Sequence, residues 1–198
     1  MSQAKPHRKL VKHYHDPGDL HELTFSCYQR QPLLTNDAWR QQLARCIDAA
    51  CDEFEMRLAA FVFMPEHVHV LVVPLNPEPA IDEYLARIKQ PFSKWVKQQL
   101  TAAHSPLLSR LTVEERPGKR CFRFWQEGPG YDRNLSTPTV IEAVIEYIHM
   151  NPVRRGLVKR AARWKWSSAS WYLLDAPRQQ LSGLPFIHGL PAGTVNRI

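Results

Sequence analysis

The sequence predicts an α+β domain in which helices pack on one face of an antiparallel sheet. Apolar runs of strand length alternate with longer amphipathic segments in the order β-α-β-β-α-β, which is typical of the split βαβ arrangement, and one further helix follows. The 198 residues are enough to bury a substantial core, and no internal repeat divides them. We therefore expect a single folded domain.

The first four elements are expected in the N-terminal part of the chain. A strand at residues 23–28 follows a Pro-Gly turn, and residues 35–37 (Thr-Asn-Asp) provide the start of a helix whose apolar positions recur up to Phe54. Two apolar runs, residues 61–64 and 67–73, lie on either side of a Pro-Glu break. Such runs predict two hairpin-linked strands that are buried on both faces.

The second half of the pattern contains more breaks. Apolar residues recur at helical spacing over residues 81–95, although Pro91 predicts a kink or a break in that helix. Residues 101–121 lack periodicity and contain two prolines and a glycine, so we expect a loop there. A fourth strand is predicted at residues 121–126. A third helix is predicted at residues 137–150, because a cap residue precedes a proline at its first position.

Charge and cysteine usage narrow the class of protein. The net charge of +7 favours a polyanionic partner, most simply nucleic acid. The four cysteines include no Cys-x-x-Cys pair, and no apolar run reaches the ~18 residues that span a bilayer, so we expect a soluble, cytoplasmic protein. We divide the chain into a basic N-terminal arm (residues 1–20), a folded domain (residues 21–172) and an irregular, turn-rich C-terminal tail (residues 173–198).

Two histidines, His67 and His69, stand one residue apart within the predicted third strand. Side chains alternate across a strand, so both imidazoles point to the same face and could form half of a metal site. Neutral imidazole is the commonest metal ligand in proteins. Histidines on buried strands also occur as hydrogen-bonded core residues, and the spacing by itself leaves both interpretations open.

A second group of polar side chains falls on the third predicted helix. Tyr147 and Asn151 are four positions apart, so they share one edge of that helix, beside a core stripe that includes Ile148. A tyrosine there could line a groove, or it could be a boundary residue with its hydroxyl in water. Asn151 precedes Pro152 and could instead cap a short helix at residues 153–156.

A run of cations follows directly after that helix, and no acidic residue occurs from residue 153 to residue 172. Two tryptophans, Trp164 and Trp166, are interleaved with the cations. Cations beside aromatic rings are typical of proteins that bind single strands or hairpins, although tryptophans in such a run are more often part of the core. The predicted nucleic-acid-binding residues are Arg154, Arg155, Lys159, Arg160, Arg163 and Lys165.

Four motifs together resemble the single-tyrosine HUH transposases, and within them the branch of REP-associated tyrosine transposases. They are Met-Pro-Glu-His-Val-His-Val-Leu-Val at residues 64–72, Phe-Trp-Gln-Glu-Gly at 124–128, Tyr-Ile-His-Met-Asn-Pro-Val-Arg-Arg-Gly-Leu-Val at 147–158 and Trp-Ser-Ser at 166–168. The resemblance covers roughly residues 20–172 in the correct order. It implies a ferredoxin-like sheet, with His67 and His69 as metal ligands. It also implies Tyr147 as the catalytic nucleophile and Asn151 as a third polar ligand.

The resemblance further implies a reaction and a substrate. Tyrosine attacks a DNA phosphodiester and forms a 5′-phosphotyrosine, while a divalent metal, Mg²⁺ or Mn²⁺, stabilises the charge that develops on the phosphate. The substrate in that branch is a short single-stranded DNA hairpin with a flanking tetranucleotide. Family members act as monomers or homodimers, and the expected location is a prokaryotic nucleoid. The general base is not assigned, because Glu66 could equally cap the turn before the histidines.

Two alternative functions would keep part of these residues. A hairpin-binding regulator would retain the fold and the cations but have little catalytic activity. A metal hydrolase or oxygenase would use His67 and His69 without Tyr147, and it would need a further His, Asp or Glu ligand. The complete His-His-Tyr-Asn set favours the transposase interpretation over both.

Overall fold

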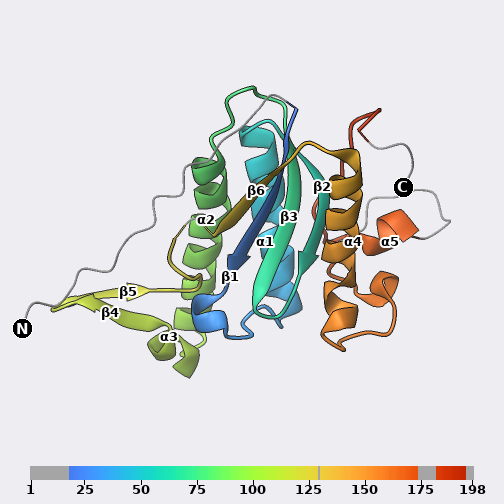
Figure 1. The fold of residues 1–198 in the computed structure, drawn as a ribbon. Coiled ribbons are helices and arrows are strands. Elements are labelled where there is room, and N and C mark those ends of the chain that lie inside the picture. Colours follow the sequence, from blue (N-terminus) through green and yellow to red (C-terminus); the bar gives the residue numbers. More distant parts are fainter. Residues whose placement is uncertain (1–17, 129, 174–181, 195–198) are drawn as a thin grey trace, which may run out of the picture.

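A four-stranded antiparallel sheet lies at the centre of the computed structural model, which describes residues 18–128, 130–173 and 182–194 (Figure 1). Its strands are β1 (Leu20–Ser26), β2 (Met56–Phe63), β3 (His67–Pro74) and β6 (Tyr131–Leu135), and they lie in the order β2-β3-β1-β6. The strand that carries the two histidines is therefore internal, with β1 paired along one side and β2 along the other.

Helices cover both faces of this sheet, whereas the sequence predicted helices on one face. The helices α1 (Asp37–Glu53) and α2 (Ile81–Ala102) pack on the face that carries Leu23 and Phe25. The helix α4 (Pro138–Arg154) packs on the opposite face, over β2 and β3 (Figure 1). Because β2 and β3 are covered on both faces, their sequences are nearly continuous apolar runs, with no alternation that would reveal the second layer.

The first two helices begin and continue for identifiable reasons. Asn36 caps α1, since its side-chain oxygen accepts hydrogen bonds from the backbone N–H groups of Ala38 and Trp39 at 2.8 and 3.2 Å. The helix α2 continues through Pro91, so the predicted break does not occur. The neighbouring Phe92 is fully buried, and such packing compensates for the hydrogen bond that proline cannot donate. No helix within the described residues is long and apolar enough to cross a membrane.

The segment predicted to be a loop, residues 101–121, contains regular structure that projects from the rest of the molecule (Figure 1). It forms α3 (Pro106–Arg110), which Ser105 caps, and a hairpin of β4 (Thr112–Arg116) and β5 (Lys119–Phe122). The hairpin strands are largely exposed. Their sequence therefore lacks the apolar periodicity from which strands are predicted.

The fourth strand of the sheet is β6 and not the strand predicted at residues 121–126, of which only Cys121 and Phe122 are extended, as the end of β5 in the separate hairpin. Phe124 and Trp125 in that segment are buried, but they pack as aromatic rings beneath α2, and Trp125 forms an isolated bridge instead of a ladder. The edge strand begins directly after Gly130, where a Cβ atom would lie 2.4 Å from the backbone oxygen of Thr24. Glycine at this position lets β6 approach β1 closely enough to pair.

The chain after α4 returns to cover the outer edge of β2. It passes through η2 (Ala161–Arg163) and α5 (Ala169–Leu173), and between them residues 166–168 form backbone hydrogen bonds to β2. In the predicted irregular tail, residues 182–194 form no helix or strand, but Ile187 is buried and the backbone N–H of His188 donates to β2. These contacts shield an edge strand that would otherwise expose unpaired backbone groups.

The N-terminal end of the described chain leads directly into the sheet. The basic arm predicted for residues 1–20 lies outside the described residues up to residue 17, and β1 already begins at Leu20. After β1, a short 3₁₀ helix, η1 (Tyr28–Arg30), turns the chain towards α1.

Candidate active site

Three of the predicted site residues meet on the face of the sheet that α4 covers. His67 and His69 belong to β3, and Tyr147 extends towards them from α4. The ring centroids of the two histidines are 4.8 Å apart, and those of His69 and Tyr147 are 5.6 Å apart with an interplanar angle of 90°. The histidines are 6 % and 5 % exposed, whereas Tyr147 is 39 % exposed. A ligand in solvent can thus reach the phenol while the imidazoles are shielded.

Each imidazole is oriented through one ring nitrogen. His67 Nδ1 lies 3.2 Å from Oε1 of Glu66, and His69 Nδ1 lies 2.8 Å from the hydroxyl oxygen of Thr24. Glu22 is farther away, with its Oε1 atom 4.0 Å from His69 Nδ1. Within the part of the chain that the structure describes, Nε2 is therefore the nitrogen of each ring that remains to bind a metal, and the partner on Nδ1 sets its direction.

Burial keeps both imidazoles neutral. It lowers the pKa of His69 to about 3, and the neighbouring His67 and Arg30 act in the same direction, because a second positive charge beside them is unfavourable. Burial also lowers the pKa of His67, although the carboxylate of Glu66 opposes this shift. Neutral imidazole is the form that binds a metal, so neither histidine has to lose a proton before coordination at neutral pH.

Asn151 lies inside α4, so the alternative in which it caps a separate short helix at residues 153–156 is wrong. Its side-chain Nδ2 donates to the backbone oxygen of Tyr147 at 2.8 Å. This bond adds a donor in the turn where Pro152 lacks one, and the helix continues to Arg154. Because Nδ2 is used in this way, Oδ1 is the Asn151 atom that a cation could bind.

The predicted set of ligand atoms would suit a divalent cation. Two imidazole nitrogens and one amide oxygen form a mixed set that suits Mn²⁺, while Mg²⁺ prefers oxygen ligands. Across residues 18–128, 130–173 and 182–194, no group of three or more His, Cys, Asp or Glu side chains is arranged to hold a metal ion. Asn151, one turn after Tyr147 on α4, stays the predicted third ligand.

Glu66 connects the histidine strand to the end of α4. Its carboxylate oxygen Oε1 accepts a hydrogen bond from His67 Nδ1 and also lies 3.0 Å from Nη1 of Arg155. The side chain is buried, so this charged contact is shielded from water on the carboxylate side. These contacts make Glu66 a residue that positions His67, in addition to its place in the turn between β2 and β3.

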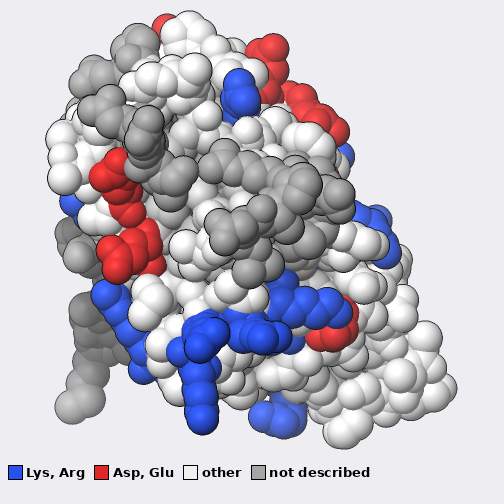
Figure 2. Space-filling view, turned by 90° about the vertical axis from the view of Figure 1, so that its right-hand side faces the viewer, with Lys and Arg blue, Asp and Glu red and all other residues white. Residues whose placement is uncertain are grey.

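The six cations that the sequence predicted to bind nucleic acid are all exposed, and they lie around the end of α4. Figure 2 shows Lys and Arg side chains gathered on this side of the molecule. Arg154 covers the ring of Tyr147, with its guanidinium carbon 5.1 Å from the ring centroid. Lys165 is engaged within the protein, because its ammonium group lies 3.3 Å from Asp37. The remaining members are Arg155, which contacts Glu66, and Lys159, Arg160 and Arg163 in the segment after the helix.

The two tryptophans among these cations are structural. Trp166 is buried, and Trp164 is half-buried with its Nε1 donating to the backbone oxygen of Phe63 at 3.1 Å. The guanidinium carbon of Arg40 lies 5.4 and 5.3 Å from the centroids of the two rings. Both side chains therefore join the segment that follows α4 to the helix α1, and neither is placed to stack on a base.

A groove of about 650 Å³ leads from His69 and Tyr147 across the β1–β6 side of the sheet. It exists because α4 covers β2 and β3 but leaves this side of the same face open. The sequence did not identify the polar strand residues that line it, which are Glu22, Thr24, Tyr131 and Arg133. Glu22 and Thr24 are two residues apart on β1, as are Tyr131 and Arg133 on β6, so each pair points to one face of the sheet. Such a short alternation only weakly predicts a shared surface. The pairing of β1 with β6, which brings them together, joins residues far apart in the chain.

Comparison with known families places the histidines within a matched segment. Residues 20–112 match a family model described as transposase, IS200 like. Tyr147 and Asn151 lie beyond the matched residues. None of the curated proteins compared with this chain matches it.

Two solved structures resemble this chain to different degrees. The structure of the REP-associated tyrosine transposase bound to a REP hairpin shares 18 % sequence identity and a TM-score of 0.60, over 94 % of this chain and 99 % of that chain. A candidate transposase from Deinococcus radiodurans R1 shares 15 % identity and a TM-score of 0.44, over 73 % of this chain and 94 % of that chain. The first similarity confirms the predicted α+β fold, a ferredoxin-like antiparallel sheet with an additional C-terminal helix.

Proposed function

We propose that the protein nicks and rejoins single-stranded hairpin DNA through a phosphotyrosine at Tyr147, and the match of residues 20–112 to the model of IS200-like transposases supports this proposal. One observation carries the proposal. The ring of the exposed Tyr147 on α4 lies 5.6 Å, between centroids, from that of His69, which forms a buried and oriented pair with His67. A nucleophile, a candidate metal site and a route from solvent thus meet at one point.

The proposed reaction exchanges one phosphodiester for another. The Tyr147 oxygen attacks the phosphorus, a bond forms between that oxygen and phosphorus, and the bond from phosphorus to the 3′ oxygen breaks. The hydroxyl proton passes to water, which can reach the exposed phenol, and the departing 3′ oxygen takes a proton to become a hydroxyl. Rejoining is the reverse attack by a 3′ hydroxyl on the phosphotyrosine. No nucleotide cofactor is needed, because the number of phosphodiester bonds is unchanged.

His67, His69 and Asn151 would hold the divalent cation. When bound, Mn²⁺ or Mg²⁺ supplies positive charge that stabilises the phosphate as negative charge develops on it. Glu66 and Thr24 keep the two imidazoles in a fixed orientation, which lowers the cost of arranging the ligands. Arg154 adds a further positive charge directly beside the phenol.

The exposed cations around the end of α4 support a DNA substrate. Cations on a shared surface bind phosphates whatever the base sequence, and they hold the strand next to the nucleophile. The solved structure with a similar fold holds a REP hairpin, and we propose a hairpin of the same class for this chain. His67, His69, Tyr147 and Asn151 all come from one chain. We therefore expect that a monomer contains every protein residue of the proposed catalytic site.

The test uses single-stranded hairpin oligonucleotides labelled at either the 5′ or the 3′ end. With Mn²⁺ or Mg²⁺ present, we expect an SDS-resistant adduct that carries the 3′ label, while the 5′-labelled piece is released with a 3′ hydroxyl. A chelator should abolish the adduct, and the corresponding duplex should give much less of it. Asn151→Ala should weaken cation binding, measured separately by Mn²⁺ titration.

Each alternative function predicts a different product in the same experiment. Hairpin binding without any adduct would indicate a regulator. Cleavage without an adduct would indicate a metal hydrolase. An adduct that carries the 5′ label would contradict the proposed direction of attack.

A further inference from the structure

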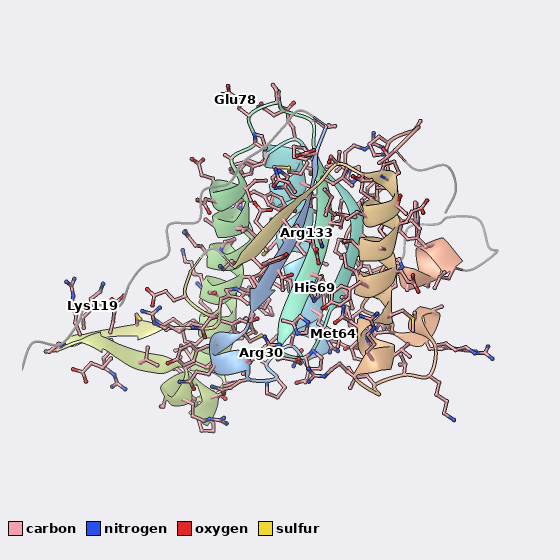
Figure 3. The ribbon with its side chains drawn as sticks, viewed as in Figure 1. Arg30, Met64, His69, Glu78, Lys119 and Arg133 are labelled. Carbon is pink, nitrogen blue, oxygen red and sulfur yellow. The ribbon has the colours of Figure 1, made fainter. Side chains whose placement is uncertain are left out.

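On the face of the sheet where α4 packs over β2 and β3, the part formed by β1 and β6 is left uncovered and forms a groove beside Tyr147. We call it the β1–β6 groove and define it by Glu22, Thr24, Tyr131 and Arg133, with His69 and Tyr147 at its inner end. Figure 3 shows Arg133 and His69 over the same central part of the sheet. The groove is continuous with the proposed site, so a strand whose phosphate lies at Tyr147 must pass over or beside it.

The strand pairing arranges the lining residues in two rows. Tyr131 pairs with Thr24, and Thr24 pairs with His69, so these three form a row across β6, β1 and β3. Arg133 pairs with Glu22 in the next row. Neighbouring strands are ~4.8 Å apart, so Tyr131 is about 10 Å from the histidine strand. This distance suits a residue that contacts a nucleotide next to the reacting phosphate.

The chemical groups in the groove match those of a nucleotide. Tyr131 is 53 % exposed, so its ring is free to stack on a base. Arg133 is an exposed cation on the same face of β6, two residues farther along, where a phosphate can approach it. Threonine and tyrosine hydroxyls add neutral hydrogen-bonding groups between them.

Glu22 decides which way a nucleotide would lie. Its side chain is 8 % exposed, with Oε1 4.0 Å from His69 Nδ1, and the charge of Arg133, in the paired position of β6, acts on its carboxylate. A carboxylate with little access to water gains from a ligand that supplies an N–H group. The same negative charge repels a phosphate. A nucleotide in the groove should therefore turn its base inward to Glu22 and its phosphate outward to Arg133.

We propose that the β1–β6 groove binds one unpaired nucleotide that adjoins the reacting phosphate, with its base stacked on Tyr131 and an N–H edge donated to Glu22. Arg133 holds the phosphate of that nucleotide. The groove thereby sets the register of the strand relative to Tyr147 and reads one base. This inference rests on the proposed function, because it names how the same site selects its DNA.

The test combines abasic substrates with protein variants. Each position that flanks the hairpin is made abasic in turn, and binding of every oligonucleotide is measured for the wild type and for Tyr131→Ala. One abasic position should weaken wild-type binding about tenfold, and the same change should have little effect in Tyr131→Ala, because the stacked pair is already lost. Phe186→Ala removes an equally exposed aromatic ring, located on the surface beside Asp48 of α1, and should keep the wild-type response.

Glu22 and Arg133 have their own expected responses. Glu22→Gln replaces a pure acceptor by a group that also donates, so it should change the ranking of the four bases at that one position. Arg133→Gln should weaken binding of all four bases alike and reduce its salt dependence. Thermal unfolding of each variant identifies a loss of fold. Tyr131→Leu keeps apolar volume but not an aromatic ring, so the abasic position should have as little effect on its binding as on that of Tyr131→Ala.

The outcomes separate this inference from the proposed function. If the wild type forms the tyrosine adduct but no abasic position is coupled to Tyr131, the groove proposal is overturned and the function stands. If the base ranking is the same in Glu22→Gln as in the wild type, the role of Glu22 is overturned. If the wild type neither binds hairpins nor forms an adduct, both proposals fail together.

Discussion

Each site histidine is held by a different neighbour, and this sets how the two would respond to mutation. His69 depends on a neutral hydroxyl from β1, whereas His67 depends on a carboxylate that is itself held by Arg155. The contact from Arg155 to Glu66 joins the end of the tyrosine helix to the histidine strand. A single substitution at Glu66 should therefore disturb both the orientation of His67 and the contact that holds the end of α4, the helix that carries Tyr147.

Glu66→Gln should lower the affinity for Mn²⁺ by about tenfold or more, because the partner that orients a metal-binding histidine contributes on that scale. The amide keeps the size of the side chain but loses the charge that Arg155 and His67 share. Glu142→Gln, on the opposite flank of α4, is the matched control and should leave the affinity unchanged. Equal affinities for the wild type and Glu66→Gln would contradict the positioning role.

His149 gives the fold a defined sensitivity to acid. It is buried, its Nε2 lies 2.8 Å from the hydroxyl of Ser168, and burial lowers its pKa to about 4 from an ordinary value of 6.5. Above pH 6.5 the residue is neutral in both the folded and unfolded states. Below this pH the unfolded state binds the proton first, so stability is lost as the pH falls from 6.5 towards 4.

His149→Gln should flatten this part of the stability profile. The free energy of unfolding of the wild type should fall more steeply than that of the variant, by about 1.4 kcal/mol per pH unit for the one proton involved. Urea unfolding at several pH values measures both slopes. Parallel profiles would mean that His149 does not bind its proton preferentially in the unfolded state.

Side chains close together in sequence were predicted better than those joined by strand pairing. His67 and His69 share a strand face, and Tyr147 and Asn151 share a helix edge, so local periodicity was enough to group each pair. Thr24 reaches His69 because β1 and β3 pair in one register out of several, and no local pattern identifies that register. The lining of the groove was missed for the same reason.

At the scale of elements, long periodic segments were predicted and short exposed ones were not. The helices α1, α2 and α4 each bury an apolar stripe, which the sequence displays directly. The edge strand β6 is mostly exposed, whereas the aromatic residues 121–126 before it look more like a strand. Those aromatic side chains fill the core beneath α2, so their burial reflects packing and not sheet pairing.

Gly130→Ala tests whether the start of β6 is determined by close approach to β1. The added Cβ atom would lie 2.4 Å from the Thr24 oxygen at a backbone φ of +95°, and we expect a loss of about 2–4 kcal/mol in unfolding free energy. Gly118→Ala is the control, since its φ of +76° is also unfavourable but nothing lies within 4 Å. Equal losses in the two variants, measured by urea unfolding, would rule out the steric contribution.

At the scale of the whole molecule, positive charge is concentrated where α4 ends. The chain carries a net charge of +7, and residues 153–172 contribute cations without any acidic residue. This surface lies beside Tyr147, while the helices α1 and α2 cover the opposite face. The distribution predicts that DNA affinity depends on salt mainly through one side of the molecule.

Removing three of these cations should reduce the salt dependence of hairpin binding. The slope of log K against log salt concentration should fall by about 2, at about 0.7 for each phosphate contact with a single strand. A matched triple variant on the α1–α2 side should leave the slope unchanged, and a similar reduction in both would contradict a localised surface. The two sets are Lys159→Gln, Arg160→Gln and Arg163→Gln, against Arg45→Gln, Lys94→Gln and Lys97→Gln.

The central claim is that Tyr147 forms the covalent bond to DNA, and the most direct measurement compares two tyrosine variants. Tyr147 and Tyr131 line the same groove and are both exposed, so Tyr147→Phe and Tyr131→Phe each remove one accessible hydroxyl. With a labelled hairpin and Mn²⁺, the SDS-resistant adduct should be absent in Tyr147→Phe and present in Tyr131→Phe, with hairpin binding retained in both. An adduct that persists in Tyr147→Phe would contradict the account.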